Sequence, residues 1–359
     1  MSRSLFDFVS FTHGGAMRNR FALAPLTNLQ SHDDGSLSDD EFNWLALRAQ
    51  GGFGMTMTCA TSVRADGKGF PGQLGIYSDT HLVGLERLAQ AIKAAGSLAA
   101  VQLHHAGIRS PRELVDEIRA PWDDEKTGAR ALTAGEVEQL VEDFINAAKR
   151  AERAGFDGVE LHGAHGYLIA QFFDAENNRR HDRYGGSFEN RTRILFEMID
   201  GVRANTGPNF QLGVRLSPER FGVTLADARR LAQQLLSCGK IDYLDMSLWD
   251  AFKEPVEKEF KGKPLIAYFT DLERGGTRLG VAGKIMDAQT AQACIDSGAD
   301  FVMIGRAGVL HHDFPQRVKH DARFEAAARP VTRDYLRGEG LGEPFINYLA
   351  TNWQGFVDG

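Results

Sequence analysis

Cysteine is scarce in this chain of 359 residues, and its three cysteines, Cys59, Cys238 and Cys294, lie far apart. No CxxC pair occurs, which argues against a zinc ribbon or an iron–sulfur cluster. A sparse and odd number of cysteines is typical of the reducing cytoplasm. We therefore expect a cytoplasmic protein.

Long apolar runs and long basic runs are also absent. No stretch reaches the roughly 18–20 apolar residues that a membrane-spanning helix needs, and the N-terminal MSRSLFDFVSF lacks the apolar region of a signal peptide. The net charge is −7, and Lys and Arg are spread along the chain. Neither a membrane nor nucleic acid is therefore an expected partner. The apolar share of 43% and the charged share of 25% are those of an ordinary globular protein.

Eight short apolar segments alternate with longer segments of helical periodicity. The short segments have the Val, Ile, Leu and Phe content of buried parallel strands, and they cover residues 20–25, 53–60, 98–105, 158–164, 211–217, 243–248, 277–285 and 301–306. The expected helices cover residues 79–96, 133–155, 190–207, 224–239, 287–298 and 315–324, and residues 249–276 are expected to form a loop. This alternation predicts an α/β fold, a (β/α)8 TIM barrel. An open doubly wound sheet is the alternative, but its nucleotide-binding motifs are missing.

The two ends of the chain predict additions to the barrel. Residues 6–19 contain an HGG turn and predict a hairpin that closes the barrel bottom. Residues 331–359 are apolar and aromatic enough to pack on the barrel or on a neighbouring subunit, so a homo-oligomer is possible. We expect one barrel domain over residues 1–330, including the cap, and a C-terminal extension over residues 331–359.

Polar and apolar side chains alternate along four of the expected strands. Because successive side chains of a strand point to opposite faces, the apolar ones should face the helices. The remaining ones should point into the barrel: Gln102, Glu160, His162, Arg215 and Asp245. Buried polar groups need partners, and an internal pair such as Glu160 with Arg215 is one interpretation. For the whole set we favour a ligand site, because the C-terminal ends of barrel strands form the catalytic face of this fold.

The last two expected strands end in glycine followed by a basic residue: Gly283 with Lys284, and Gly305 with Arg306. The loops after strands seven and eight of this fold often bind phosphate through backbone N–H groups. Each pair is also compatible with a tight turn. Together they indicate a cofactor or substrate that carries a phosphate.

The segment LHGAHGYLIAQFF places His162, His165 and Tyr167 directly after the fourth strand. A metal site is one interpretation, although HxxH lacks the spacing and the internal Glu of the zincin motif. Two structural histidines are a second interpretation. The third is a pair of N–H donors for a substrate oxygen, with Tyr167 as a proton donor.

HGAHGYLIAQFF, followed by NNRRHDRYGGSFENR, resembles the old yellow enzyme family of FMN-dependent ene reductases, and the two histidines resemble its histidine-pair subgroup. NRFALAPLTN, VQLHHAG, VRLSPERF, VAGKI and MIGR are similar to further segments of that family and follow in the same order. The resemblance covers about residues 5–324. It implies an FMN-binding TIM barrel with NADH or NADPH as the reductant.

The resemblance also implies roles for individual residues. His162 and His165 would bind the oxygen of an activating carbonyl or nitro group, and Tyr167 would donate the proton, so these three are the implied catalytic and substrate-binding residues. The implied cofactor-binding residues are Ala24, Pro25, Leu26, Thr27, Ala60, Gln102, Arg215, Gly283, Lys284, Gly305 and Arg306.

The activity that the resemblance implies has two half-reactions at one site. NADH or NADPH gives a hydride to flavin N5. An activated alkene then takes the hydride at its β-carbon and a proton from Tyr167 at its α-carbon. Thr27 and Asn28 stand where the histidine-pair subgroup often has Cys and Tyr. The alternative function is a cofactor-free or metal-using barrel lyase or isomerase that acts on a phosphorylated small molecule.

Overall fold

A computed structural model describes residues 3–358 of the chain. Its strands are β1 (Phe21–Leu23), β2 (Met55–Ser62), β3 (Leu98–His104), β4 (Arg119–Ala120), β5 (Arg130–Ala131), β6 (Gly158–Gly163), β7 (Gln211–Leu216), β8 (Tyr243–Ser247), β9 (Arg278–Ala282) and β10 (Phe301–Ile304). Its α-helices are α1 (Asp39–Gln50), α2 (Leu82–Ala94), α3 (Ala134–Arg153), α4 (Leu168–Phe173), α5 (Phe188–Asn205), α6 (Leu225–Ser237), α7 (Ala267–Thr270), α8 (Ala288–Asp296), α9 (Arg306–Leu310), α10 (Phe314–His320), α11 (Arg333–Gly338) and α12 (Glu343–Asn352).

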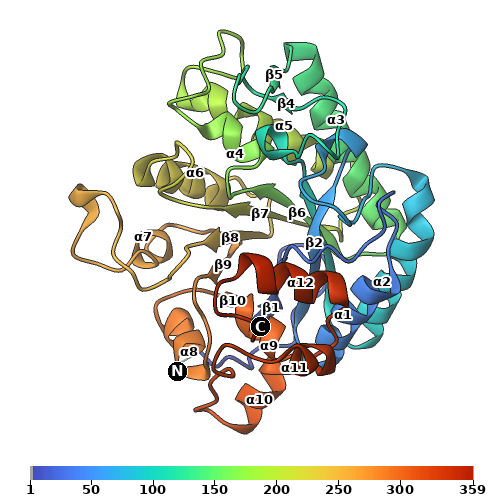
Figure 1. The fold of residues 1–359 in the computed structure, drawn as a ribbon. Coiled ribbons are helices and arrows are strands. Elements are labelled where there is room, and N and C mark those ends of the chain that lie inside the picture. The colour runs from blue at the N-terminus through green and yellow to red at the C-terminus, as the bar shows by residue number, and fades with distance from the viewer. Residues whose placement is uncertain (1–2, 359) are drawn as a thin grey trace.

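Eight of the strands close into a parallel barrel in the order β1-β10-β9-β8-β7-β6-β3-β2, and the helices surround it (Figure 1). The predicted TIM barrel is therefore confirmed, and all eight expected strands form. The clearest difference is β9, which ends at Ala282 although we expected it to reach residue 285. Lys284 has a φ of 53°, which no extended strand can contain.

Six of the twelve α-helices in residues 3–358 begin at a residue whose side chain accepts a hydrogen bond from the first turn. In α3 the side chain of Thr133 accepts from the N–H of Glu136, and the Glu136 carboxylate accepts from the N–H of Thr133. This reciprocal pair is a capping box. Helix α1 was not predicted, because Glu41 and Arg48 interrupt its buried face. A helix, α7, also lies within residues 249–276, where we expected a loop.

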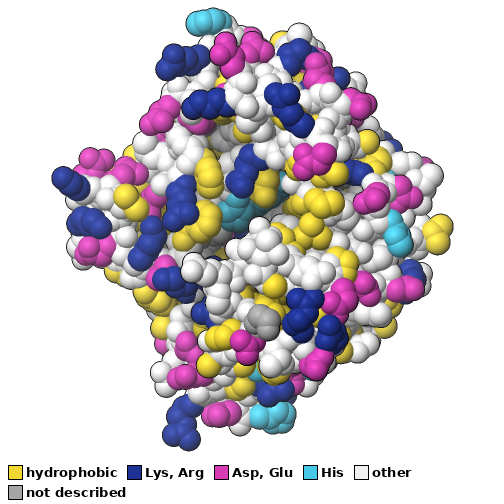
Figure 2. All heavy atoms as spheres, viewed as in Figure 1, with side chains coloured by type: hydrophobic (Ala, Val, Ile, Leu, Met, Phe, Trp, Pro, Cys, Tyr) yellow, Lys and Arg dark blue, Asp and Glu magenta, His cyan; other side chains and the backbone are white. Residues whose placement is uncertain are grey.

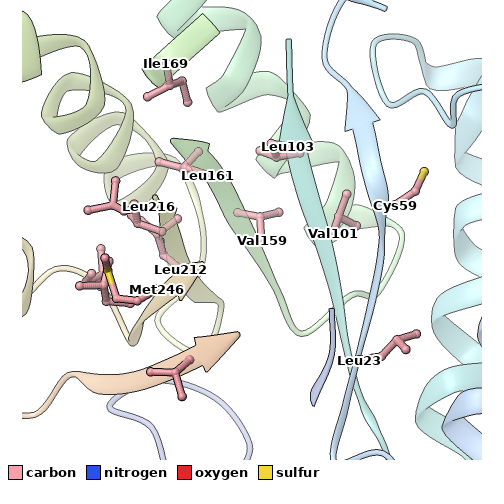
Figure 3. Packing of buried hydrophobic residues seen from close by; sticks show 14 of the residues in the cluster. Leu23, Cys59, Val101, Leu103, Val159, Leu161, Ile169, Leu212, Leu216 and Met246 are labelled. Atoms are coloured by element: carbon pink, nitrogen blue, oxygen red, sulfur yellow. The ribbon is translucent and has the colours of Figure 1, made fainter. Parts of the chain in front are cut away.

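The main hydrophobic core lies between the barrel and its helices. Val101 and Leu103 on β3, and Val159 and Leu161 on β6, belong to it, and Figure 3 shows them beside one another on neighbouring strands. These are the residues that the alternation assigned to the helix-facing side of the strands. Their opposite neighbours are therefore free to line the barrel interior.

Both ends of the described chain pack on the barrel. Val9 and Met17 form an antiparallel bridge, and the ring of Phe11 packs against Tyr243 and Phe301, with centroid distances of 5.8 and 6.4 Å. The predicted N-terminal cap therefore forms. At the other end, Phe345 of α12 packs on Trp44 of α1 at 5.0 Å, and Figure 1 shows α11 and α12 beside α1. The proposed division at residue 330 stays a prediction.

Within residues 3–358, no helix combines the length and apolar character that a membrane crossing requires.

Candidate active site

A cavity of about 470 Å³ opens at the C-terminal ends of the barrel strands. Its volume is typical of a site for a small molecule or a cofactor. Figure 2 shows histidine side chains in the hollow at the middle of this face, with basic and hydrophobic side chains around it. The cavity brings together every residue for which the family resemblance implied a role: Ala24, Pro25, Leu26, Thr27, Ala60, Gln102, His162, His165, Tyr167, Arg215, Gly283, Lys284, Gly305 and Arg306. Glu160 and Asp245, which the strand alternation had also assigned to the barrel interior, are buried beneath it and do not line it.

The barrel strands position the deepest polar groups side by side. Gln102 is paired in register with Glu160, and Arg215 with Asp245. Gln102 Nε2 donates to Glu160 Oε1 at 2.7 Å, and Arg215 Nε lies 2.8 Å from Asp245 Oδ2. The internal ion pair of Arg215 is therefore with Asp245 and not with Glu160.

The charge of the Arg215 guanidinium acts on two buried carboxyl groups, those of Glu160 and Asp245. Burial, and then the charge of Asp245, raise the pKa of Glu160 to about 8. Burial also raises the pKa of Asp245, while Arg215 opposes that rise. Since Asp245 has the guanidinium as its direct partner, we assign the proton to Glu160 at neutral pH. Arg215 then lines the floor of the cavity as a cation, and its anionic partner Asp245 lies buried beneath that floor.

His162 and His165 lie next to each other at the end of β6, with ring centroids 5.1 Å apart. Burial lowers the pKa of both imidazoles well below the usual value, so both are neutral at pH 7. The ring nitrogen His165 Nε2 lies 2.8 Å from Ser247 Oγ, and the backbone N–H of His165 donates to Ser217 Oγ. His162 Nδ1 is buried and has no hydrogen-bond partner among the described residues. The pair therefore offers neutral ring nitrogens to the cavity.

Tyr167 is the residue before α4, and aromatic and cationic groups surround its ring. His104 lies 4.4 Å from the ring centroid and His162 5.3 Å from it. The guanidinium of Arg109 lies 4.8 Å from the same centroid. Burial lowers the pKa of His104 to about 3, so this neighbour is also neutral. The phenol is thereby held beside the histidine pair at the cavity wall.

The two glycines at the other end of the cavity differ in their surroundings. A Cβ at residue 283 would lie 2.7 Å from the backbone N of Ala251, so the packing of the chain alone requires glycine there. A Cβ at residue 305 would meet only a Leu26 side-chain atom, at 3.9 Å. Packing of the chain does not require glycine at residue 305, and the half-buried Cα of Gly305 is open to the close approach of a ligand.

The sequence did not single out several other residues of the cavity wall. Phe221 and Trp249 lie in loops, Ser247 ends β8, and Arg109 ends a short 3-10 helix. Tyr348 and Trp353 come from α12 and its end. Ser247 follows the alternation along β8 and was identifiable from it. The loop and C-terminal residues carry no periodic signal, because tertiary packing alone brings them to the cavity.

Backbone conformation marks the same wall. Of the six described non-glycine residues with positive φ, four line the cavity: His165 (59°), Phe221 (59°), Trp249 (63°) and Lys284 (53°). Side chains with a Cβ rarely adopt this region. Such conformations cluster at functional sites, where the surrounding structure holds them in place.

Comparison with known proteins identifies the family. Residues 4–325 match the model of the NADH:flavin oxidoreductase / NADH oxidase family. The chain belongs to this family. A probable NADH-dependent flavin oxidoreductase of Bacillus subtilis is 38% identical, and the match covers 99% of this chain and 98% of that protein. Three further curated relatives are longer, and the match covers between 33% and 50% of their length.

Solved structures of the same family have the same fold. An old yellow enzyme homologue from Zymomonas mobilis matches with a TM-score of 0.79 and 29% identity, covering 96% of this chain and 99% of that one. Morphinone reductase in complex with tetrahydroNAD matches with a TM-score of 0.79 and 28% identity, covering 97% of each chain. This family member is a flavin-dependent NAD(P)H oxidoreductase of the old yellow enzyme type, with FMN as its cofactor.

Proposed function

We propose that this NADH:flavin oxidoreductase family member reduces activated C=C bonds of α,β-unsaturated carbonyl or nitro compounds. The observation that carries the proposal is the grouping of two neutral imidazoles, His162 and His165, with the phenol of Tyr167 on one wall of the cavity. A lyase or isomerase without a cofactor would leave the flavin chemistry of the family unexplained.

The cavity suits FMN by its size and by the chemistry of its walls. When bound, FMN accepts a hydride from the nicotinamide and passes it to the alkene. Gln102 and Arg215 would bind the polar edge of the flavin ring, and the charge of Arg215 favours negative charge there. Residues Ala24 to Thr27 and Ala60 would line the ring. A shift in strand register between Met57 and Ala60 breaks the regular pairing of β2 just before Ala60.

The phosphate end of the cavity would use backbone and basic groups together. Gly283 and Gly305 would present N–H groups, and Lys284 and Arg306 would add positive charge. Lys284 is 3.0 Å from Asp250, whereas Arg306 has no carboxylate within 4.0 Å among residues 3–358. An anionic phosphate would supply that missing partner.

On the substrate side, His162 and His165 would donate hydrogen bonds to the activating oxygen as neutral N–H groups. The Ser247 hydroxyl beside His165 Nε2 can donate or accept, so this contact fixes the orientation of the ring in either tautomer. Tyr167 would then protonate the α-carbon. Positioned proton transfer of this kind contributes about a hundredfold or more to a rate.

The test of this function is to separate the two half-reactions by anaerobic stopped-flow spectroscopy. Flavin reduction by NADH and by NADPH is followed first, and reoxidation by an enone and by a nitroalkene is followed second. Tyr167→Phe should leave flavin reduction within about threefold and slow reoxidation by about a hundredfold. Tyr77→Phe, which removes a hydroxyl outside the cavity, is the matched control.

Equal loss in both half-reactions would remove Tyr167 from the role of proton donor. Absence of enone and nitroalkene reduction by the wild-type flavoprotein would contradict the proposed function itself. The histidine-pair subgroup, a homo-oligomer and a cytoplasmic location stay predictions. Light scattering on the purified protein tests the oligomer.

A further inference from the structure

The cavity is strongly basic although the chain as a whole is acidic. Four of its lining side chains are cationic, namely Arg109, Arg215, Lys284 and Arg306, and no described Asp or Glu lines it. The whole chain, in contrast, has a net charge of −7. A group of cations that runs against the overall charge indicates that the ligands are anionic.

Three of these four cations already have a partner or a proposed ligand. Arg215 pairs with Asp245 beneath the proposed flavin ring, and Lys284 and Arg306 lie at the proposed phosphate end. Arg109 lies elsewhere, beside Tyr167 on the substrate wall. The proposed cofactor therefore accounts for every cation of the cavity except Arg109.

The chain holds the backbone of Arg109 in a fixed position. Arg109 ends a short 3-10 helix, Gly107–Arg109, that follows β3. The buried side chain of Gln171 on α4 accepts from the N–H of Ile108 and donates to the carbonyls of Ala106 and Gly166. These hydrogen bonds tie the loop of Arg109 to the loop that carries Tyr167. The two side chains are thereby kept together.

The guanidinium itself is only partly used by the protein. One nitrogen donates to the carbonyl oxygen of His165, and the group packs over the rings of Tyr167 and Phe221, at 4.8 and 5.9 Å. No carboxylate lies within 4.0 Å of it in the part of the chain that the structure describes. A guanidinium has five N–H donors in a fork that matches a carboxylate, so the side chain retains donors for a ligand.

The neighbouring histidines do not suit the same group. His162 and His165 are neutral, so they suit an uncharged carbonyl or nitro oxygen, whereas Arg109 suits a full negative charge. We infer that Arg109 binds a carboxylate of the alkene substrate, so that the preferred substrates carry a carboxylate in addition to the carbonyl or nitro group bound by the histidine pair. This inference rests on the proposed function, because it assigns the substrate class of the same site.

The diphosphate of NADH or NADPH is the other source of anionic oxygens for Arg109. The two sources differ in which half-reaction they affect. A substrate carboxylate makes Arg109 important only when the organic ligand binds, and a diphosphate makes it important only when the nicotinamide dinucleotide binds.

Calorimetry on the FMN-loaded enzyme tests the inference without turnover. The two ligands are saturated ketones of matched shape, 3-oxocyclohexane-1-carboxylate and its uncharged methyl ester. Arg109→Gln should weaken binding of the carboxylate by about ten- to a hundredfold, as expected for charge-assisted hydrogen bonds, and of the ester by less than about threefold. Arg109→Lys should restore part of the affinity for the carboxylate, because it returns the charge without the fork.

Arg112→Gln is the matched control. Arg112 lies in the same loop and donates to the Thr127 carbonyl outside the cavity, so its loss should change neither ligand. Equal weakening of the carboxylate and the ester by Arg109→Gln would overturn the inference, because Arg109 would then only shape the wall. The ester also reports whether a variant still has a folded site.

The second arm measures flavin reduction by NADH and by the uncharged N-benzyl-1,4-dihydronicotinamide. We expect Arg109→Gln to leave both within about threefold. A loss of tenfold or more for NADH alone, with carboxylate binding unchanged, would overturn the inference and assign Arg109 to the diphosphate. Calorimetry measures the preference of the wild-type enzyme for the carboxylate over the ester without alkene reduction. A failure of this inference can therefore be distinguished from a failure of the proposed function.

Discussion

The two halves of the barrel interior differ in chemistry. On β1, β2 and β10 the buried interior residues are apolar: Ala22, Ala24, Met55, Met57, Phe301 and Met303. On β3, β6, β7 and β8 the interior carries the polar and charged side chains Gln102, Glu160, His162, Arg215 and Asp245 toward the C-terminal ends of the strands. The apolar half excludes water, and this strengthens every electrostatic interaction in the polar half. The polar half then provides the charge and hydrogen bonds that a flavin and its substrate need.

The comparison also explains where protons are held. A carboxyl group beside an apolar wall is expensive to ionise, and Glu160 responds with a pKa of about 8. Arg215 offsets part of the same cost for its partner Asp245. Burial therefore makes both carboxyl groups costly to ionise, and the ion pair within the polar half decides that Glu160 carries the proton. Four substitutions test this comparison, from the largest expected effect to the smallest.

The largest effect is expected in the apolar half. Phe301 is fully buried and packs against the rings of Phe11 and Tyr243. Phe301→Ala should lower the free energy of unfolding by about 4 kcal/mol, because it leaves a cavity, and the loss should be equal at pH 5 and pH 8. Denaturant unfolding at both pH values measures it, and Phe8→Ala, at an exposed position, should cost little. A pH-dependent loss would contradict the separation of the halves.

The second effect lies in the polar half and depends on pH. Arg215→Met removes the cation that two buried carboxyl groups share, which should cost about 3 kcal/mol at pH 8. The loss of the cation should raise the pKa values of Glu160 and Asp245 further. At pH 5 both carboxyl groups are then protonated and uncharged, so the loss of stability should be smaller than at pH 8. The same unfolding measurement decides, and an equal loss at pH 5 and pH 8 would show that the carboxyl groups are not coupled to Arg215.

The third effect isolates a single proton. In the unfolded chain Glu160 has its ordinary pKa, and in the folded protein the pKa is about 8. Between these values only the folded state holds the proton, so stability must fall as pH rises. Relative to Glu160→Gln, the wild-type protein should lose about 1 kcal/mol of unfolding free energy per pH unit between pH 5 and pH 8. If the unfolding free energies of the wild-type protein and of Glu160→Gln changed with pH in the same way, Glu160 would not be the group that holds the proton.

The smallest effect concerns the orientation of His165. Ser247→Ala removes the hydroxyl that lies 2.8 Å from His165 Nε2. We expect the KM for an enone to rise by about fivefold, equivalent to about 1 kcal/mol, with kcat within about twofold. Ser297→Ala, at an exposed helix end, is the control. A change in kcat alone would assign Ser247 to the chemical step instead of to binding.

Strand alternation explains why so much of the site was predictable from the sequence. Gln102, His162 and Arg215 occupy interior positions of strands whose other face is apolar, so period two alone placed them. The alternation could not predict which carboxylate pairs with Arg215, because only the closed barrel shows that Arg215 is in register with Asp245. Tyr348 and Arg109 were beyond it as well, since they reach the cavity through packing between segments distant in the chain.

Fold prediction had a similar limit. The barrel followed from eight apolar segments, but α1 was missed because its buried face includes Arg48. That guanidinium lies 3.3 Å from the ring centroid of Trp44 and donates to the carbonyls of Gly308 and Glu339. A charged residue that is buried for structural reasons breaks the periodic pattern from which a helix is recognised.

Directed evolution of the substrate range will find that the positions around the cavity differ in the substitutions they accept. His165, Phe221, Trp249 and Lys284 all have a left-handed backbone, in which Gly is comfortable, Asn and Asp are accepted and β-branched residues are strained. A saturation library at these four positions will therefore return few Val, Ile or Thr variants, whatever their fit to the substrate. Half-buried wall positions with ordinary helical backbone, such as Tyr348 on α12, accept changes of shape at lower cost, so productive libraries should begin there.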